Sequence, residues 1–220
     1  MSDWLTFHRA IIVLESPWEL DSTDANRSSV LPFISGIAKL AGDTDVLHAN
    51  FYDGSSLLLA AKCLAKSRHK NAVVYVAAHG GDGEVGDVDL LNMFAAIQVF
   101  AKQCNITGVL IGSCYGGECI TKLQSGIEAS HLRWCASYAS SAFWLQGTLL
   151  DCAILESMLD LPAAAYKKGE KMIERLAMAI SLLSDLSHRR RRQRRAHVLG
   201  RVAAIRHSAG RPGAPGAQRE

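Results

Sequence analysis

The sequence has no apolar run that approaches the roughly 20 residues a helix needs to cross a bilayer, so we expect no membrane span. A secretion signal is not indicated either. The start carries Asp3 and Arg9, and the apolar run 10–14 that follows is shorter than the core of a signal peptide. These two absences predict a cytoplasmic protein.

Metal-binding and nucleotide-binding motifs have little support. No CxxC pair occurs, and a zinc site built from His79, Cys114 and Cys119 is disfavoured because zinc ligands usually come in closely spaced pairs. No G-x-x-x-x-G-K-[ST] loop is present, which argues against the commonest phosphate-binding loop. We therefore expect neither a metal nor a cofactor.

Charge is distributed unevenly along the chain. Residues 1–187 contain 14 Lys and Arg against 20 Asp and Glu, whereas residues 188–220 contain ten Arg against a single Glu. The second part cannot bury a core, so we predict one folded domain over 1–187 and a flexible Arg-rich, Gly- and Pro-containing tail over 188–220. The run Arg189–Arg195 weakly suggests contact with nucleic acid or an acidic surface through charge alone. A solvated extension is the simpler interpretation.

Short apolar runs alternate with helical patterns through residues 1–187. Continuous apolar runs such as 72–78 are typical of strands buried on both faces. The alternation predicts an α/β fold, with a mostly parallel sheet of about five or six strands and helices on both faces. The expected strands are 10–14, 45–52, 72–78, 108–112 and 133–138, and the expected helices are 30–40, 57–66, 89–103, 118–125, 141–159 and 163–186.

Chemically active side chains follow two of the predicted strands. Strand 72–78 runs into His79 and Gly80, and strand 108–112 runs into Cys114, with more glycine after each. Taken singly, such a histidine is usually a surface residue and such a cysteine a core residue. Together at one edge of a parallel sheet they suit a thiolate nucleophile and an imidazole general base and acid. The N–H groups of Gly80 and Cys114 are the expected oxyanion donors.

The two strand ends resemble a known family. An apolar run ending in His79-Gly80, followed about 35 residues later by a strand that ends in Cys114 before glycine, looks like the caspase-like (clan CD type) cysteine peptidases, including small bacterial caspase-like and CHAT-type proteases. The resemblance implies that Cys114 is the nucleophile, His79 the general base and acid, and Gly80 a glycine of the oxyanion hole. Metacaspases carry an acidic residue two positions before the cysteine, where this chain has Gly112, so that substrate preference does not transfer.

The resemblance also indicates where a substrate pocket should lie. The segment 137–144, after the fifth predicted strand, should flank it, and Tyr138 and Trp144 are the candidate lining residues. The loop after the first strand offers Arg27 for an acidic substrate side chain and Asp21 for a basic one. These two indications contradict each other.

We predict a cysteine endopeptidase that acts on a protein or peptide substrate through a Cys/His dyad. The family resemblance implies limited proteolysis of a partner protein in a bacterial defence or signalling setting, such as antiviral defence, and leaves room for a regulatory protein partner. Two alternatives remain. The G-x-C-x-G pattern around Cys114 also fits a glutamine-amidotransferase-like cysteine hydrolase, although such enzymes normally take their histidine from farther downstream. A non-catalytic caspase-like scaffold that binds a partner is the other alternative.

Overall fold

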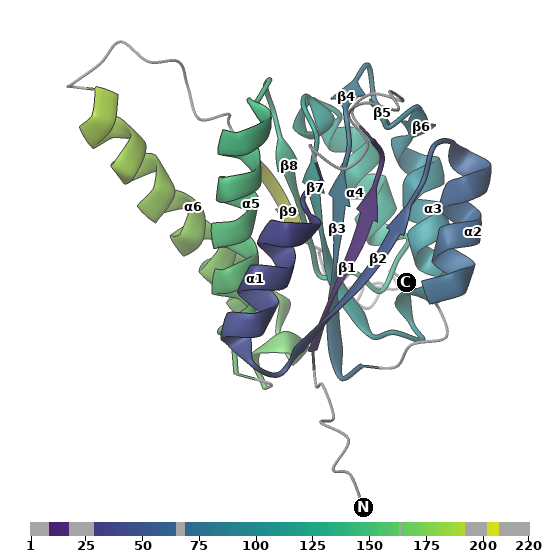
Figure 1. The fold of residues 1–220 in the computed structure, drawn as a ribbon, viewed down its shortest axis with the longest axis horizontal. Coiled ribbons are helices and arrows are strands. Elements are labelled where there is room, and N and C mark those ends of the chain that lie inside the picture. The colour runs from purple at the N-terminus through teal and green to yellow at the C-terminus, as the bar shows by residue number, and fades with distance from the viewer. Residues whose placement is uncertain (1–8, 18–28, 65–68, 163, 192–201, 207–220) are drawn as a thin grey trace, which may run out of the picture.

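The computed structural model describes residues 9–17, 29–64, 69–162, 164–191 and 202–206, and Figure 1 shows their arrangement. A twisted sheet runs through the middle, and helices cover both of its faces. No helix among these residues is long and apolar enough to cross a membrane.

The central sheet has six strands in the order β2-β1-β3-β7-β8-β9. The first five lie parallel to one another, and only β9 runs antiparallel, against β8. This confirms the predicted α/β class and the mostly parallel sheet. The strands are β1 (Arg9–Glu15), β2 (Thr44–Asn50), β3 (Asn71–Ala77), β7 (Ile106–Gly112), β8 (Trp134–Tyr138) and β9 (Val202–Arg206).

Burial on both faces explains the continuous apolar runs of the inner strands. The side chains of β1 after its first residue are all buried, and β3 repeats the pattern. One face packs against α2, α3 and α4, and the other against α1, α5 and α6. The helices are α1 (Leu31–Ala41), α2 (Gly54–Leu64), α3 (Leu90–Ala101), α4 (Ile120–Glu128), α5 (Trp144–Leu159) and α6 (Gly169–Arg191), with short 3₁₀ turns at Gly116–Glu118 and Ala165–Lys167.

Regular structure extends past the predicted domain boundary at residue 187. Helix α6 continues to Arg191, and β9 pairs with all five residues of β8, from Val202 opposite Tyr138 to Arg206 opposite Trp134. The division into a folded domain over 1–187 and a flexible tail over 188–220 stays a prediction. Residues 192–195 of the Arg run lie outside the described residues.

A second, smaller sheet follows β3. Its strands β4 (Gly80–Gly81), β5 (Glu84–Val85) and β6 (Val88–Asp89) are antiparallel and lead directly into α3. Gly81, Gly83 and Gly86 have the G-x-G-x-x-G spacing of a dinucleotide loop, but here Gly81 belongs to β4, and Gly83 and Gly86 lie in the tight turns of this sheet. The Asp89 carboxylate itself accepts from the first free N–H groups of α3, so no amide donors at that helix start are left for a phosphate.

Candidate active site

The parallel register brings the two strand-end motifs to the same edge of the sheet. Strands β3 and β7 are neighbours, and Ala77 lies opposite Gly112 at their carboxyl ends. His79 follows β3 by two residues, and Cys114 follows β7 by two residues. The side chain of His79 is exposed and that of Cys114 is half-buried. Both candidate residues therefore leave the sheet from adjacent strands and at the same level.

Gly80 packs directly against the chain around Cys114. A Cβ on Gly80 would collide with the carbonyl oxygen of Cys114 and lie 2.8 Å from Ser113 Oγ. Any side chain at this position would push the two strand ends apart, which is why glycine is required after His79. The contact fixes the main chain next to the candidate base against the main chain of the candidate nucleophile.

The small sheet leaves the N–H group of Gly80 pointing away from its partner strand. Gly86 N–H donates to the His79 carbonyl oxygen at 2.8 Å, so these two residues form a hydrogen-bonded pair. The next pair of the same antiparallel ladder, Gly80 with Val85, is then a non-hydrogen-bonded one, whose N–H groups face outward. The N–H of Gly80 therefore does not bond to β5, which is the geometry that an oxyanion donor at this position would need.

The sulfur of Cys114 is held by the loop between β8 and α5. Ala142 N–H donates to Cys114 Sγ at 3.4 Å, and the thiol donates to the Ala142 carbonyl oxygen at 3.7 Å. Ala142 lies two residues before the 16-residue helix α5 begins, so the positive end of that helix lies near the sulfur. The helix expected over 118–125, after Cys114, does not begin at the sulfur. A 3₁₀ turn comes first, and α4 starts later, at Ile120.

A pocket opens beside Cys114. Its cavity volume is only about 20 Å³, room for about one water molecule, and it opens to solvent. Two candidates named from the sequence, Tyr138 and Trp144, line it. Phe33 of α1 contacts Trp144 edge-to-face at a centroid distance of 5.9 Å. The other two candidates, Arg27 and Asp21, lie outside the described residues.

The pocket contains a buried acid that the sequence did not single out. Asp151 of α5 is 2% exposed, and its carboxylate accepts from Tyr75 Oη at 2.7 Å and from Tyr138 Oη at 2.8 Å. Burial raises the pKa of Asp151 to about 7, while the two hydrogen bonds act in the opposite direction. Burial likewise raises the pKa of both tyrosines, so they remain donors. In the sequence, the signal that could have pointed to Asp151 is its place as an acidic residue within the apolar stretch Leu149–Ile154.

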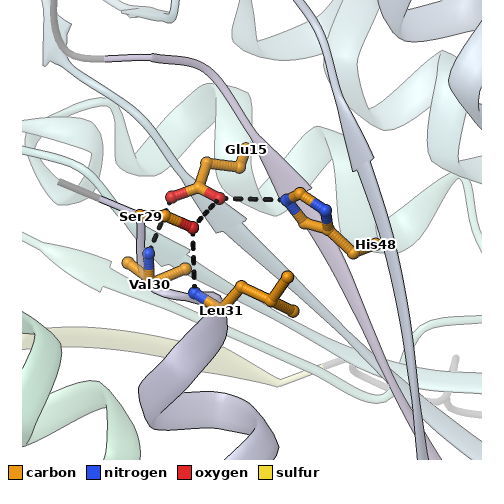
Figure 2. Close-up of polar contacts among 5 residues, drawn as sticks. All are labelled: Glu15, Ser29, Val30, Leu31 and His48. Carbon is orange, nitrogen blue, oxygen red and sulfur yellow. Dashed lines mark hydrogen bonds and ion pairs between the residues drawn. The ribbon is translucent and has the colours of Figure 1, made fainter. Parts of the chain in front are cut away.

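A second buried carboxylate fixes the start of α1 (Figure 2). Glu15, at the carboxyl end of β1, is 6% exposed and accepts from the N–H of Val30 at 2.8 Å and from Ser29 Oγ at 2.9 Å. His48 Nε2 of β2 lies 3.0 Å from the same carboxylate, and Leu31 N–H donates to Ser29 Oγ. Because Val30 lines the pocket, this network positions one of its walls.

The other thiols lie in different surroundings. Burial raises the pKa of Cys135, and it raises that of Cys152 to about 11, so both remain protonated thiols near neutral pH. Cys119 is half-buried under the turn at Gly83. Among the described residues, no three His, Cys, Asp or Glu side chains converge as they would in a metal site.

Comparison with known proteins gives a likeness in structure only. No family model matches the sequence, and no curated protein matches it. A secreted C11 cysteine protease from Bacteroides thetaiotaomicron, solved with an irreversible peptide inhibitor, superposes with a TM-score of 0.50 at 10% identity, over 77% of this chain and 57% of that one. A second structure of this C11 protease, named iotapain, gives 0.45 at 9% identity over 62% and 54%.

The first likeness shows the fold. The chain shares its α/β fold with this C11 cysteine protease. It spans little more than half the length of that protease.

Proposed function

We propose that this protein is a cysteine endopeptidase with Cys114 as nucleophile and His79 as general base and acid. One observation carries the proposal: the Gly80 main chain packs against Ser113 and Cys114 at the ends of neighbouring parallel strands, next to a pocket. The shared fold with a C11 cysteine protease supports the same chemistry.

The proposed reaction has two halves. The Cys114 thiolate attacks the carbonyl carbon of the peptide bond, and the N–H groups of Gly80 and Cys114 stabilise the negative charge on the carbonyl oxygen. Protonated His79 gives its proton to the leaving amine as the C–N bond breaks, which leaves a thioester on Cys114. Water then attacks the thioester while His79 removes its proton, and release of the acid restores the Cys114 thiolate beside protonated His79.

Intact-mass spectrometry after a short iodoacetamide treatment at pH 6 tests the nucleophile. We expect one fast alkylation in the wild-type protein that disappears in Cys114→Ala and persists in Cys119→Ala, the matched control. The same three proteins, with His79→Ala, are then incubated with a peptide library. Cleavage should require Cys114, and His79→Ala should slow it by about 100-fold or more.

Two results would contradict the proposal. Slow labelling spread over several cysteines, together with no cleavage of the library, would favour a non-catalytic scaffold. Release of ammonia from glutamine that depends on Cys114 but not on His79 would favour an amidotransferase-like hydrolase. Limited proteolysis of a bacterial partner protein, a cytoplasmic location and a regulatory partner remain predictions from the sequence.

A further inference from the structure

Five cations lie at the amino edge of the central sheet, the edge where its parallel strands begin. Lys70 immediately precedes β3, and Arg133 immediately precedes β8. Lys102 lies in the turn from α3 to β7, and Lys167 and Lys168 lie in the turn that leads to α6. The four lysines are exposed and the arginine is half-buried. We call this set the amino-edge cations.

Contacts between the strand starts hold these cations side by side. The side-chain amide of Asn105, just before β7, donates to the carbonyl oxygen of Lys70. The N–H group of Arg133 donates to a carbonyl oxygen of β7 at 2.9 Å. A Cβ on Gly169, the first residue of α6, would lie 3.8 Å from the Cβ of Arg133, which brings Lys168 beside β8. Neighbouring strands lie about 4.8 Å apart, so the cations form a row across β3, β7 and β8 that ends beside α6.

The charges of the amino-edge cations are not balanced within the fold. Among the described residues, no acid forms an ion pair with any of the five. Other acids at this edge are already paired, because Asp43, Asp160 and Glu174 each contact a different Arg or Lys. That leaves Glu128 and Glu170 as the acids of this region that have no ion pair with a described residue. Five cations against these two acids make the edge positive.

This positive edge runs against the overall charge of the domain. Residues 1–187 contain 14 Lys and Arg against 20 Asp and Glu. Five exposed acids lie instead at the opposite edge, in the turns that follow β2, β3 and β7: Asp53, Asp82, Glu84, Asp87 and Glu118. The antiparallel strand β9 ends at the amino edge and places Arg206 there, opposite Trp134. A positive face on an otherwise acidic domain indicates an anionic partner.

The other residues at the amino edge favour nucleic acid over protein or lipid. Among the described residues, the large apolar side chains exposed there are Leu40, at the end of α1, and Val99, in the last turn of α3. The exposed rings of Tyr52, Tyr115 and Phe143 follow the carboxyl ends of β2, β7 and β8. Protein interfaces need an apolar and aromatic core, lipid surfaces take inserted apolar side chains, and single strands stack their bases on aromatic rings. Interfaces with duplex nucleic acid are polar and strongly positive, as this edge is.

We propose that the amino edge of the central sheet binds the phosphate backbone of a nucleic-acid duplex without reading its sequence. The amino-edge cations contact phosphate oxygens and displace the counterions condensed on the duplex. Cys114 lies at the other edge of the sheet, after the carboxyl end of β7. The binding surface is therefore separate from the candidate active site, and the inference does not depend on the proposed peptidase activity.

Fluorescence anisotropy of a labelled DNA duplex of about 20 base pairs, titrated with the 220-residue chain, tests the inference. Four or five neutralised phosphates should give a slope of about −4 when the logarithm of the binding constant is plotted against that of the NaCl concentration. Two duplexes of unrelated sequence should bind within about threefold of each other, because backbone contacts carry no sequence information. Absence of binding at about 50 mM NaCl, or a binding constant that does not change with salt, would overturn the inference.

A triple variant locates the binding surface. Lys70→Gln, Lys167→Gln and Lys168→Gln together remove three exposed cations from the amino edge. We expect this variant to bind the duplex at least about 30-fold more weakly at about 50 mM NaCl, and the salt slope to become shallower by about three, one for each lost phosphate contact. Binding as tight as that of the wild-type chain would overturn the inference.

A second triple variant with the same change in charge is the matched control. Arg189→Gln, Arg190→Gln and Arg191→Gln act on the last three residues of α6, about 33 Å along the helix axis from its start at the amino edge. The salt slope should change by less than about one in this variant. A loss equal to that of the lysine variant would show that binding follows net charge or the Arg run, and would overturn the inference.

Two measurements on the wild-type chain test the position and the class of partner without any variant. A saturating amount of the duplex should leave the rate at which iodoacetamide labels Cys114 within about twofold, because the two sites lie at opposite edges of the sheet. Strong protection of Cys114 would place the duplex at the other edge and overturn the inference. Tighter binding to vesicles that contain phosphatidylserine than to the duplex would also overturn it, in favour of a lipid surface.

Discussion

Gly80 and Cys114 are in main-chain contact, although 33 residues separate them in the sequence: a Cβ on Gly80 would collide with the carbonyl oxygen of Cys114. The neighbouring glycine, Gly81, has nothing within 4 Å of its own Cβ position. Two adjacent glycines therefore differ completely in what a methyl group would do.

This difference predicts opposite outcomes for two alanine variants. Gly80→Ala should separate the strand ends, reduce alkylation of Cys114 by at least about tenfold and destabilise the fold by about 1–3 kcal/mol, as overpacking does in a dense region. Gly81→Ala should change neither quantity measurably. Alkylation rates and urea unfolding of both variants check this, and normal labelling in Gly80→Ala would mean that the contact does not shape the site.

The strands of the central sheet could be predicted because burial on both faces leaves a continuous apolar run. The expected strand 72–78 differs by one residue from β3 (Asn71–Ala77), and 108–112 covers most of β7 (Ile106–Gly112). Glycine after each strand marked the ends where His79 and Cys114 lie. The same logic could not reveal which charged residue elsewhere faces the pocket.

The features that were missed depend on tertiary placement. Asp151 lies in mid-helix, and only the packing of α5 beneath Gly112 makes it part of the pocket. β9 was missed because an antiparallel edge strand of five residues forms through main-chain hydrogen bonds and sits in an Arg-rich region. The β4–β6 sheet was missed because two-residue strands carry no periodicity.

The pairing of β9 with β8 predicts a sharp boundary for truncation. A chain that ends at Arg206 keeps β9, whereas one that ends at residue 201 leaves the fully buried strand β8 as an open sheet edge. We expect the longer chain to unfold at the same urea concentration as the 220-residue chain. The shorter one should be less stable and more prone to self-association, measured by urea unfolding and size-exclusion chromatography. Equal behaviour of the two truncations would show that β9 does not stabilise the sheet.

The Glu15 network predicts a stability effect on the pocket wall. Glu15→Gln keeps the side-chain volume but turns one carboxylate oxygen into an NH2 group, which cannot accept a hydrogen bond. The variant therefore loses either the bond from Val30 N–H or the contacts with Ser29 and His48 (Figure 2). Because the site is buried, we expect a loss of about 1–3 kcal/mol in the free energy of unfolding.

An exposed carboxylate provides the control for that variant. Glu174 pairs with Lys171 at 2.9 Å, but both side chains are well exposed, so Glu174→Gln should change stability by less than about 0.5 kcal/mol. Urea unfolding of the two variants compares them. Equal losses would mean that the Glu15 hydrogen bonds contribute no more than a surface ion pair.

The raised pKa of Asp151 predicts that stability falls as pH rises. The carboxyl titrates at about 7 in the folded protein because burial disfavours its charge, against 3.8 as the ordinary value in the unfolded chain. Between about pH 4 and pH 7 the folded state therefore holds a proton that the unfolded state has lost. The stability contributed by that proton is complete below pH 4, declines through this window and is gone above about pH 7, a change of up to about 4 kcal/mol.

Comparison with Asp151→Asn isolates this effect, because the amide does not titrate. Both proteins carry Cys114→Ala to remove the active thiol. The other titratable groups facing Asp151 are Tyr75, Tyr138 and Cys152, and burial raises the pKa of each of them, so they stay neutral across the window. From pH 4 to pH 8 the unfolding free energy of the protein with Asp151 should fall relative to that of Asp151→Asn. A pH-independent difference would mean that Asp151 is ionised throughout and balanced within the fold.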